Sequence, residues 1–237
     1  MCADWSANEE ITADKLNNRR GFKSRVRAHT SLQLTIPVGN SVVPLDFNVE
    51  DFDSNNEFDC PAQRTGTASA TSANHLVDTG ANQFVSADVG RWVYNSTDKT
   101  YAQITAYNSV SDVTISADIM ASGEGYRIYG TRFTAKVEGY YQVFCQAKVG
   151  SAEAEDFVRL CIYKNGFGTG TLLAQPMAYV SSGGANASNS CPYAIYSDLV
   201  YLDVDDYLEF GLAFDDSAAR NTSDTGIYFT IYMVSEA

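Results

Sequence analysis

The chain has 237 residues, of which 45% are hydrophobic and 12% aromatic, and its formal net charge is −13. This length allows one large β domain or two modest domains with a sizeable core. The negative charge argues against a nucleic-acid partner, because the summed field repels phosphates. No apolar run approaches the roughly 18 residues of a membrane helix, and the polar, acidic residues 1–10 are unlike a secretory signal. We therefore expect neither membrane insertion nor a signal peptide.

The first 30 residues differ from the rest of the chain in charge. Between Lys15 and Arg27 there are six cations and no acidic residue, and Thr12 can cap a short helix that precedes most of this stretch. We interpret residues 1–30 as an anchor or neck, with a solvated linker as the alternative. The residues expected to make the anchoring contacts are Trp5, Ile11, Leu16, Arg19, Arg20 and Lys23.

Short runs of alternating apolar and polar residues predict β-strands in most of the remaining chain. The predicted strands are 26–36, 42–47, 91–94, 100–107, 113–117, 126–129, 132–137, 140–149, 157–163, 194–204, 207–214 and 226–234. Two stretches are predicted to be loops: the acidic, Asn-rich residues 50–56, and residues 65–74, which contain only Thr, Gly, Ala, Ser and Asn. Many short strands with almost no helical periodicity predict an all-β sandwich or barrel.

Two of these strands, 140–149 and 226–234, have large apolar side chains on both faces. A sandwich strand has only one inner face. The second apolar face therefore requires a cover, either from another module of the chain or from another copy of it. We expect self-association, and the predicted interface residues are Tyr140, Phe144, Tyr228 and Tyr232.

Four segments of the sequence resemble the jelly roll of the complement globular-head and tumour-necrosis-factor-like family. They are Phe133-Thr134-Ala135-Lys136-Val137-Glu138-Gly139-Tyr140-Tyr141, residues 157–166 ending in Tyr-Lys-Asn-Gly, residues 199–210, and Tyr228-Phe229. The resemblance covers roughly residues 25–60 and 130–237 and implies compact trimers of ten-stranded sandwiches. The chain departs from the family pattern at Val143, where an aromatic residue is usual, and at Asp205-Asp206, where Gly-Asp is usual.

This resemblance implies a division of the chain into three parts: an N-terminal anchor segment (1–30), a jelly roll formed by 31–61 and 131–237, and a small β module (62–130) inserted into one loop. The module, from His75 to Ile119, resembles small β modules of tailed-phage virion proteins. The segment from Trp5 to Asn17 resembles the start of many phage fibre proteins. Together these resemblances imply a phage virion protein.

The residues needed for catalysis or metal binding are sparse. The chain has only two histidines, His29 and His75, and no Gly-x-Ser-x-Gly turn, so no nucleophile is paired with a base. Asp51, Asp53, Asn55 and Glu57 alternate as in the first half of a calcium loop, but position six is not Gly and position twelve is not Glu; a solvated acidic loop is favoured, with calcium left open. Reduced, buried thiols are expected at Cys2, Cys60, Cys145, Cys161 and Cys191. We expect no enzyme activity, cofactor or metal.

These observations predict a non-enzymatic, homotrimeric phage virion protein that is made in the host cytoplasm. A short tail fibre or receptor-binding protein is favoured, attached by residues 1–30 to a tail, portal or capsid protein. A capsid decoration or head-fibre protein is the alternative, and a glycan depolymerase is disfavoured. The residues expected to face a host glycan or protein receptor are Tyr179, Asn186, Asn189 and Tyr193.

Overall fold

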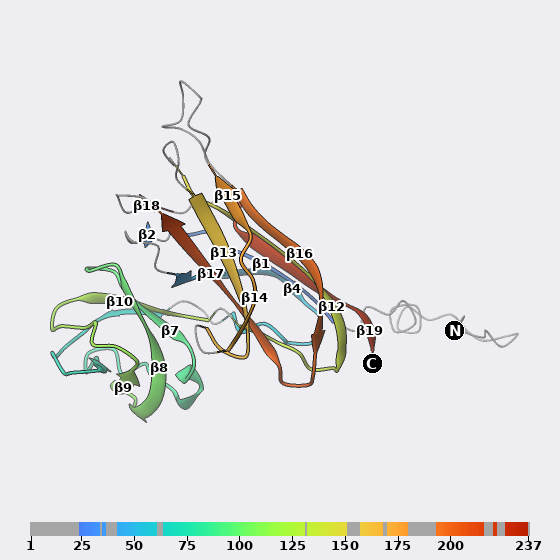
Figure 1. Cartoon of the computed structure of the whole chain (residues 1–237). Coiled ribbons are helices and arrows are strands. Elements are labelled where there is room, and N and C mark those ends of the chain that lie inside the picture. Colours follow the sequence, from blue (N-terminus) through green and yellow to red (C-terminus); the bar gives the residue numbers. More distant parts are fainter. Residues whose placement is uncertain are drawn as a thin grey trace, which may run out of the picture.

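The computed structural model describes residues 24–33, 35–36, 42–60, 64–130, 132–150, 157–167, 170–179, 193–215, 220–221 and 226–236. These residues form antiparallel β-sheets and a single short 3-10 helix, η1 (Ser86–Asp88). No helix in this part of the chain has the length and apolarity to cross a membrane. Figure 1 shows a sandwich of long strands with a smaller β module beside it. The predicted all-β jelly roll with a small additional module is confirmed.

One layer of the sandwich is a five-stranded antiparallel sheet. Its strands, in spatial order, are β16 (Tyr193–Leu202), β12 (Gly139–Lys148), β19 (Tyr228–Glu236), β1 (Arg25–His29) and β4 (Val49–Asp53). Burial alternates along these strands: Phe229, Ile231 and Met233 are buried, whereas Tyr228 and Tyr232 point to the other side. This period of two is what a half-buried strand requires.

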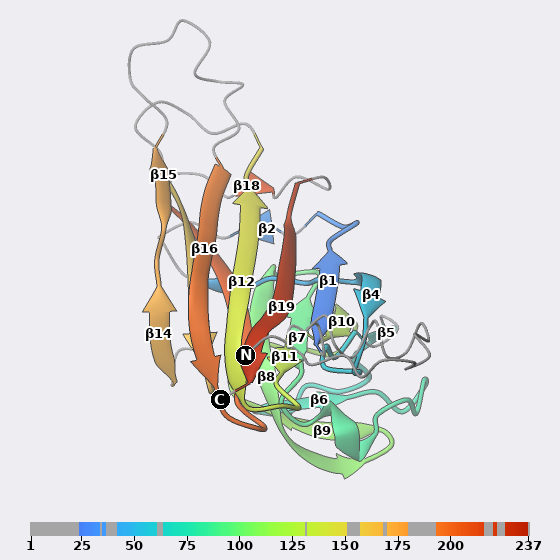
Figure 2. The same ribbon diagram turned by 90° about the vertical axis from the view of Figure 1, so that its right-hand side faces the viewer.

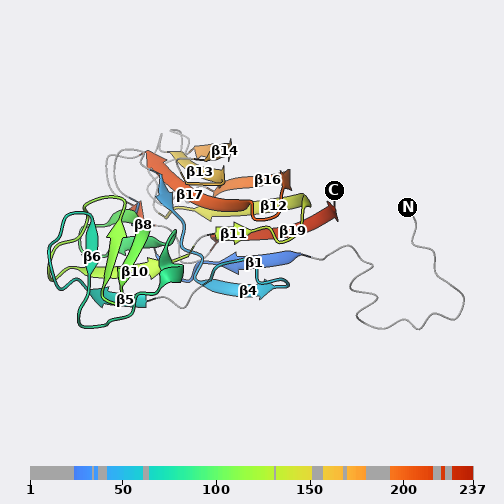
Figure 3. The same cartoon turned by 90° about the horizontal axis from the view of Figure 1, so that it is seen from below.

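The second layer consists of β11 (Arg132–Thr134), β17 (Tyr207–Asp215), β13 (Phe157–Lys164) and β14 (Thr171–Ala174), with β3 (Val43–Pro44) paired to β17 and β15 (Met177–Tyr179) paired to β13. A separate pair joins β2 (Thr35–Ile36) to β18 (Arg220–Asn221). Asn165 and Gly166, at the turn that follows β13, have positive φ angles of 61° and 138°, as a tight Asn-Gly turn demands. Figure 3 shows the two layers from one end.

A cluster of aromatic rings forms the centre of the core between the two layers. The rings of Phe210 and Phe229, one from each sheet, are stacked with centroids 5.1 Å apart, and Phe47 meets Phe229 edge-on at 4.8 Å. Such ring pairs contribute about 1 kcal/mol each beyond the burial of their area. The core therefore fixes the two sheets relative to one another.

Residues 64–130 form a small module with its own core. Its strands, in spatial order, are β5 (Arg64–Thr67), β10 (Gly125–Tyr129), β7 (Trp92–Asn95), β8 (Thr100–Ser109), β9 (Asp112–Ile115) and β6 (His75–Val77). The Ser69 amide, just beyond β5, donates a 2.8 Å hydrogen bond to the Val77 carbonyl at the end of β6, so the sheet closes on itself like a barrel. Buried Leu76, Ile104 and Ile128 belong to a cluster separate from the sandwich core.

The outer surface of β7, β8 and β10 packs against the jelly roll. Arg127 of β10 forms a 3.2 Å ion pair with Asp46, and its guanidinium lies 5.1 Å from the ring centroid of Tyr94 and 5.7 Å from that of Tyr129. The Tyr129 hydroxyl donates to the Pro44 carbonyl at 3.3 Å. Aromatic rings thus shield a buried ion pair at this junction, which strengthens the attraction between the charges.

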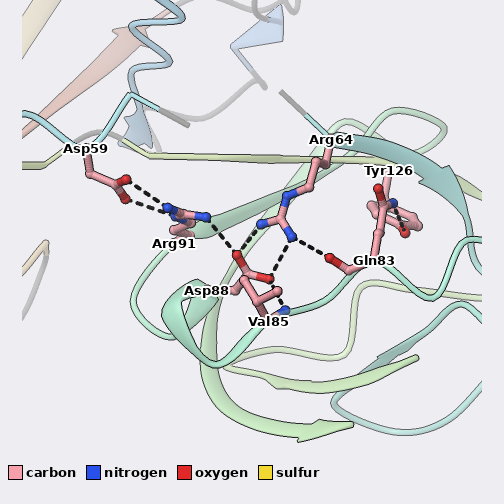
Figure 4. A network of polar contacts seen from close by, with 7 residues as sticks. All are labelled: Asp59, Arg64, Gln83, Val85, Asp88, Arg91 and Tyr126. Atoms are coloured by element: carbon pink, nitrogen blue, oxygen red, sulfur yellow. Dashed lines mark hydrogen bonds and ion pairs between the residues drawn. The ribbon is translucent and has the colours of Figure 1, made fainter. Parts of the chain in front are cut away.

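A chain of polar contacts continues from this junction into the module (Figure 4). Arg91 donates to Asp59 of the jelly roll and also to Asp88 of the module, at 2.8 Å from Nη1 to Oδ1. The buried Asp88 carboxylate also pairs with Arg64, whose Nη1 donates at 2.6 Å to the Gln83 carbonyl. Two guanidinium groups therefore compensate one buried carboxylate, as burial of a charge requires.

Three sequence-based assignments are corrected by the structure. Residues 50–56 are not wholly a loop, because 49–53 form β4; its exposed acidic side chains resemble those of a loop, but its backbone pairs with β1. Residues 64–67 form β5, paired with β10, and so overlap the first three residues of the loop predicted over 65–74. The predicted strand 26–36 is divided into β1 and β2.

The boundary of the anchor segment also changes. Residues 25–29 form β1 between β19 and β4, and the Ser24 carbonyl accepts a 3.0 Å hydrogen bond from the Met233 amide. Residues 24–30 therefore belong to the sandwich rather than to the segment that precedes it. The segment predicted to be an anchor is therefore limited to residues 1–23, which lie outside the described residues.

Candidate functional site

The side of the five-stranded sheet that faces away from the core, here called the outer face, carries the four predicted interface residues. Tyr140 and Phe144 point outward from β12, and Tyr228 and Tyr232 from β19. The structure brings Phe144 and Tyr228 together, with ring centroids 5.6 Å apart and an interplanar angle of 26°. Tyr232 lies one row further along the same face, opposite Gln142.

Sequence reasoning missed the contribution of β16 to this face. Ile195 and Leu199 are 50% and 48% exposed, and Tyr201 meets Tyr140 edge-on with centroids 5.2 Å apart. The signal was present, because residues 193–202 also have large apolar side chains on both faces. From β19 to the β16 edge the outer face thus has many exposed apolar side chains, with Gln142, Gln146 and Ser197 between them. An unusual number of exposed apolar side chains on one face marks an interaction site.

The β1 side of the outer face is more polar. Arg25, Arg27 and His29 point outward, and the Arg27 guanidinium lies 5.3 Å from the ring centroid of Tyr228. A cation over an aromatic ring is stabilised by about 0.5–1 kcal/mol at an exposed site. The outer face thus changes from aliphatic and aromatic at β16 to cationic at β1.

Two of the four predicted receptor-facing residues lie at one end of the sandwich, here called the loop end. Tyr179, the last residue of β15, is 66% exposed, and Tyr193, the first residue of β16, is 43% exposed. Figure 2 shows the ends of β15 and β16 close together at this end. Asn186 and Asn189 lie outside the described residues.

The chain enters the sandwich near the opposite end. Ser24 bonds to Met233, which pairs with Tyr141 close to the start of β12, whereas Tyr193 pairs with Lys148 at the end of β12. Because β12 is ten residues long, the two levels are separated by most of the length of the sandwich. The chain before residue 24 is thus joined to the end of the sandwich opposite to the loop end. The predicted anchoring residues Trp5, Ile11, Leu16, Arg19, Arg20 and Lys23 lie outside the described residues.

The residues of the candidate calcium loop do not converge. Asp51 pairs with Arg27 and His29, and both carboxylate oxygens of Asp53 accept backbone hydrogen bonds. Glu57 is buried, and this burial raises its pKa despite hydrogen bonds from the Ser24 hydroxyl and a backbone amide. Within the described ranges, no group of three His, Cys, Asp or Glu side chains is arranged to hold a metal ion.

The described cysteines are free thiols in protected positions. Burial raises the pKa of Cys60 to about 11, and it also raises the pKa values of Cys145 and Cys161. A raised pKa disfavours the thiolate, which is the nucleophilic form. Cys2 and Cys191 lie outside the described residues.

No protein-family model matches the chain, and no curated protein matches its sequence. Among solved structures, the globular domain of zebrafish complement 1qA is similar, with a TM-score of 0.42 and 12% identity over 91% of this chain and 100% of that chain. The Eiger TNF from S. frugiperda has a TM-score of 0.41 and 8% identity, covering 90% and 92%. Murine APRIL has a TM-score of 0.40 and 8% identity, covering 89% and 98%. The jelly-roll assignment itself follows from the strand order and the core of this chain.

Proposed function

We propose that the chain is a non-enzymatic, homotrimeric virion protein of a tailed phage, and that it acts as a short tail fibre or receptor-binding protein. The observation that carries the proposal is the difference between the two ends of the sandwich. The N-terminal segment joins one end, Tyr179 and Tyr193 are exposed at the other, and the outer face with its exposed aromatic and aliphatic side chains runs between them. This arrangement suits a protein that is attached at one end and binds at the other. The resemblances of residues 5–17 and 75–119 to phage virion proteins support the same function.

The outer face supports assembly into a closed ring. In a ring of three, each copy contacts its two neighbours with two different surfaces, and these surfaces must be complementary. The aromatic side chains of Tyr140, Phe144 and Tyr201 form one such surface, and Ile195 and Leu199 at the aliphatic margin form the other. Burial of each half-exposed side chain contributes about 1 kcal/mol.

Adhesion through the loop end requires several copies to act together. Exposed tyrosines such as Tyr179 and Tyr193 bind sugars or proteins by stacking and hydrogen bonding. Single contacts of this kind are weak. Three linked copies raise the effective affinity by about a hundredfold or more when they can bind simultaneously.

The location of the protein on the particle tests the proposal. Antibodies raised against the purified jelly roll are applied to particles of the phage that encodes the chain, and bound antibody is located by electron microscopy. Label on the tail supports a fibre or receptor-binding protein. Label on the capsid would instead support a decoration or head-fibre protein. Unlabelled particles, with the protein present in the infected lysate, would overturn a virion role.

A further inference from the structure

A pocket of about 370 Å³ opens on the β1 side of the outer face, towards the loop end. Its lining includes Arg27 and His29 of β1, Asp51 of β4 and Tyr228 of β19. These residues come from three neighbouring strands, because Arg27 lies opposite Phe52 on one side of β1 and His29 lies opposite Tyr228 on the other. The volume lies within the usual range for small-ligand sites, which begins at about 300 Å³.

Asp51 holds the two basic side chains of the pocket in place. Its Oδ2 lies 3.1 Å from Arg27 Nε, and its Oδ1 lies 3.2 Å from His29 Nδ1. These contacts use only Nε of Arg27 and Nδ1 of His29. Within the described part of the chain, the two Nη groups of Arg27 and the Nε2 atom of His29 have no other partner. The pocket therefore offers a pre-oriented guanidinium fork beside an imidazole.

The remaining walls suit a polyol. The rings of Tyr228 and Phe144 are stacked, and the Arg27 guanidinium lies 5.3 Å from the Tyr228 ring centroid, so contacts with these two residues hold the tyrosine in place. Its ring forms the apolar wall of the pocket. Ser31, at the rim, adds a hydroxyl group. A sugar ring has both an apolar C–H face and hydroxyl groups, which match these two kinds of surface.

We propose that this pocket binds one sugar unit that carries a carboxylate, such as a uronic acid, as part of a host-surface glycan. The guanidinium fork of Arg27 can donate two parallel hydrogen bonds to the carboxylate. Asp51 and Ser31 can accept hydrogen bonds from the sugar hydroxyls, and Tyr228 provides the wall against which the ring lies. The biological role rests on the proposed receptor-binding function, whereas the binding itself belongs to this pocket alone.

Local charge outweighs the acidity of the chain at this site. The net charge is −13, but exposed charges are screened beyond roughly 8 Å at physiological ionic strength. Arg25 and Arg27 point outward from β1, so the permanent charges on this side of the strand are positive. Asp51 is the acidic residue of the pocket, and it is already paired with Arg27 and His29.

The pocket is continuous with the loop end. Gly226 lines it and has a positive φ of 97°; a Cβ atom at this position would lie 3.5 Å from carbon atoms of Lys148 and Tyr193. Tyr193 was predicted to face a receptor. The pocket thus adds a concave subsite beside an exposed tyrosine at the same end of the sandwich, and three such sites in a trimer would act by avidity.

Saturation-transfer NMR titrations of the full chain test this binding with three probes: sodium glucuronate, glucose and sodium acetate. Glucuronate is expected to bind with a Kd in the millimolar range. Glucose should bind about fivefold more weakly because it lacks the carboxylate that bonds to Arg27, and acetate more weakly still because it lacks the sugar ring. Arg27→Lys keeps the charge but loses the fork, so it should weaken glucuronate binding about tenfold. Asp51→Asn should weaken it as well, because Arg27 then loses its orientation.

A matched control comes from the module. His75 Nδ1 lies 2.8 Å from Asp112 Oδ1, so Asp112→Asn disrupts the same kind of pair far from the pocket and should leave binding unchanged. Equal binding of glucose and glucuronate, equal binding of acetate, full affinity in Arg27→Lys, or no binding of any probe would each overturn the proposal. None of these outcomes bears on the particle location or the number of chains per assembly, so failure here leaves the virion function standing.

Discussion

Arg91 of the inserted module donates two hydrogen bonds to Asp59 of the jelly roll, from Nε to Oδ2 at 2.9 Å and from Nη2 to Oδ1 at 2.8 Å. The remaining Nη1 donates to the buried Asp88 of the module. One guanidinium therefore connects a carboxylate of each part. The parallel geometry with Asp59 fixes orientation as well as distance, so this contact defines how the module sits on the sandwich.

Removal of this connection should destabilise the whole chain. In Arg91→Ala, Asp88 keeps Arg64 but loses one of its two compensating cations, and Asp59 loses both hydrogen bonds. Breaking a buried ion pair in this way costs about 3 kcal/mol. Urea unfolding followed by circular dichroism measures the loss. Arg27→Ala is the control, because its ion pair with Asp51 is solvent-exposed and should change the free energy of unfolding by less than about 1 kcal/mol. Equal losses in the two variants would contradict the structural role of Arg91.

Assembly through the outer face predicts a change of mass in two variants. Light scattering should report three chains for the natural protein and one chain for Phe144→Glu or Tyr140→Glu, because an interface cannot bury an unpaired carboxylate without a cost of several kcal/mol. Val110→Glu is the matched control, since Val110 is 50% exposed, close to the 44% of Tyr140, but lies on the module just after β8. A natural protein that is monomeric at micromolar concentration would refute the assembly, and three chains in both face variants would place the interface elsewhere.

The strands that sequence could predict are those whose alternation is strong. The strands β12 and β19 were predicted in this way, and so were the aromatic residues of the outer face. The positive φ of Asp205, 69°, shows that Asp takes the turn position before β17 where the family pattern has Gly. Alternation reports the two faces of a strand, and for Tyr140 and Tyr228 this was enough to place them outside the core.

The elements that sequence could not predict depend on partners elsewhere in the chain. Residues 49–53 are largely acidic, and they form a strand only because β1 supplies the backbone hydrogen bonds. The pocket combines residues from β1, β4 and β19, and the register that places Asp51 beside Arg27 and His29 includes an irregularity between Arg27 and Ala28. Local patterns contain no information about such a register. The pairing of Arg91 with Asp59 was hidden for the same reason, because 32 residues separate the two in sequence.

Deletion of the module should leave a folded but weaker sandwich. The Asp59 amide donates to the Arg132 carbonyl at 3.0 Å, so the two ends of the module are adjacent and a short Gly-Ser linker can replace residues 62–130. The truncated chain loses the ion pair between Arg127 and the buried Asp46. We expect this loss to lower the free energy of unfolding by about 3 kcal/mol.

The midpoint and cooperativity of urea unfolding measure both effects. A single sharp transition at lower urea is the expected result, because the sandwich core contains its own aromatic cluster around Phe229. A broad, non-cooperative transition would show instead that the module completes the core of the jelly roll.

Acid should destabilise the module through Asp78. Burial alone would raise the pKa of Asp78, but hydrogen bonds from the Tyr126 hydroxyl at 2.7 Å and from the backbone amides of Gly80 and Ala81 outweigh it and lower the pKa. A lowered folded-state pKa means that the stabilisation is complete above the unfolded value near 4 and is lost as the pH falls through the folded value.

The pH dependence of thermal unfolding between pH 6 and about 2.5 tests this sign. The melting temperature of the natural protein should fall below pH 4. Asp78→Asn should have a lower melting temperature at pH 6, and this temperature should fall less on acidification. Asp205→Asn is the control, because this turn position with φ of 69° accepts Asn and should keep the natural pH dependence. An unchanged acid loss in Asp78→Asn would contradict the assignment.

The extent of an N-terminal deletion is set by Ser24. Its carbonyl accepts a hydrogen bond from the Met233 amide, and its hydroxyl donates to Glu57 at 2.5 Å. Loss of this residue would leave the buried Glu57 without that donor. A deletion that tests anchoring must therefore remove residues 1–23 only, so that any effect on particles does not come from a damaged sheet.

Removal of residues 1–23 should leave the assembled protein intact in solution and prevent its incorporation into particles. Residues 15–27 contain six cations and no anion, and the sequence after residue 30 is strongly acidic, so the basic segment is suited to docking on an acidic virion protein. Glutamate at positions 19, 20 and 23 in place of Arg19, Arg20 and Lys23 should weaken incorporation, and the defect should depend on salt because exposed charges are screened. Light scattering measures the assembly, and quantitative mass spectrometry of purified particles measures the copy number. Particles that contain the truncated protein at the normal copy number would move the attachment surface to the jelly roll or the module.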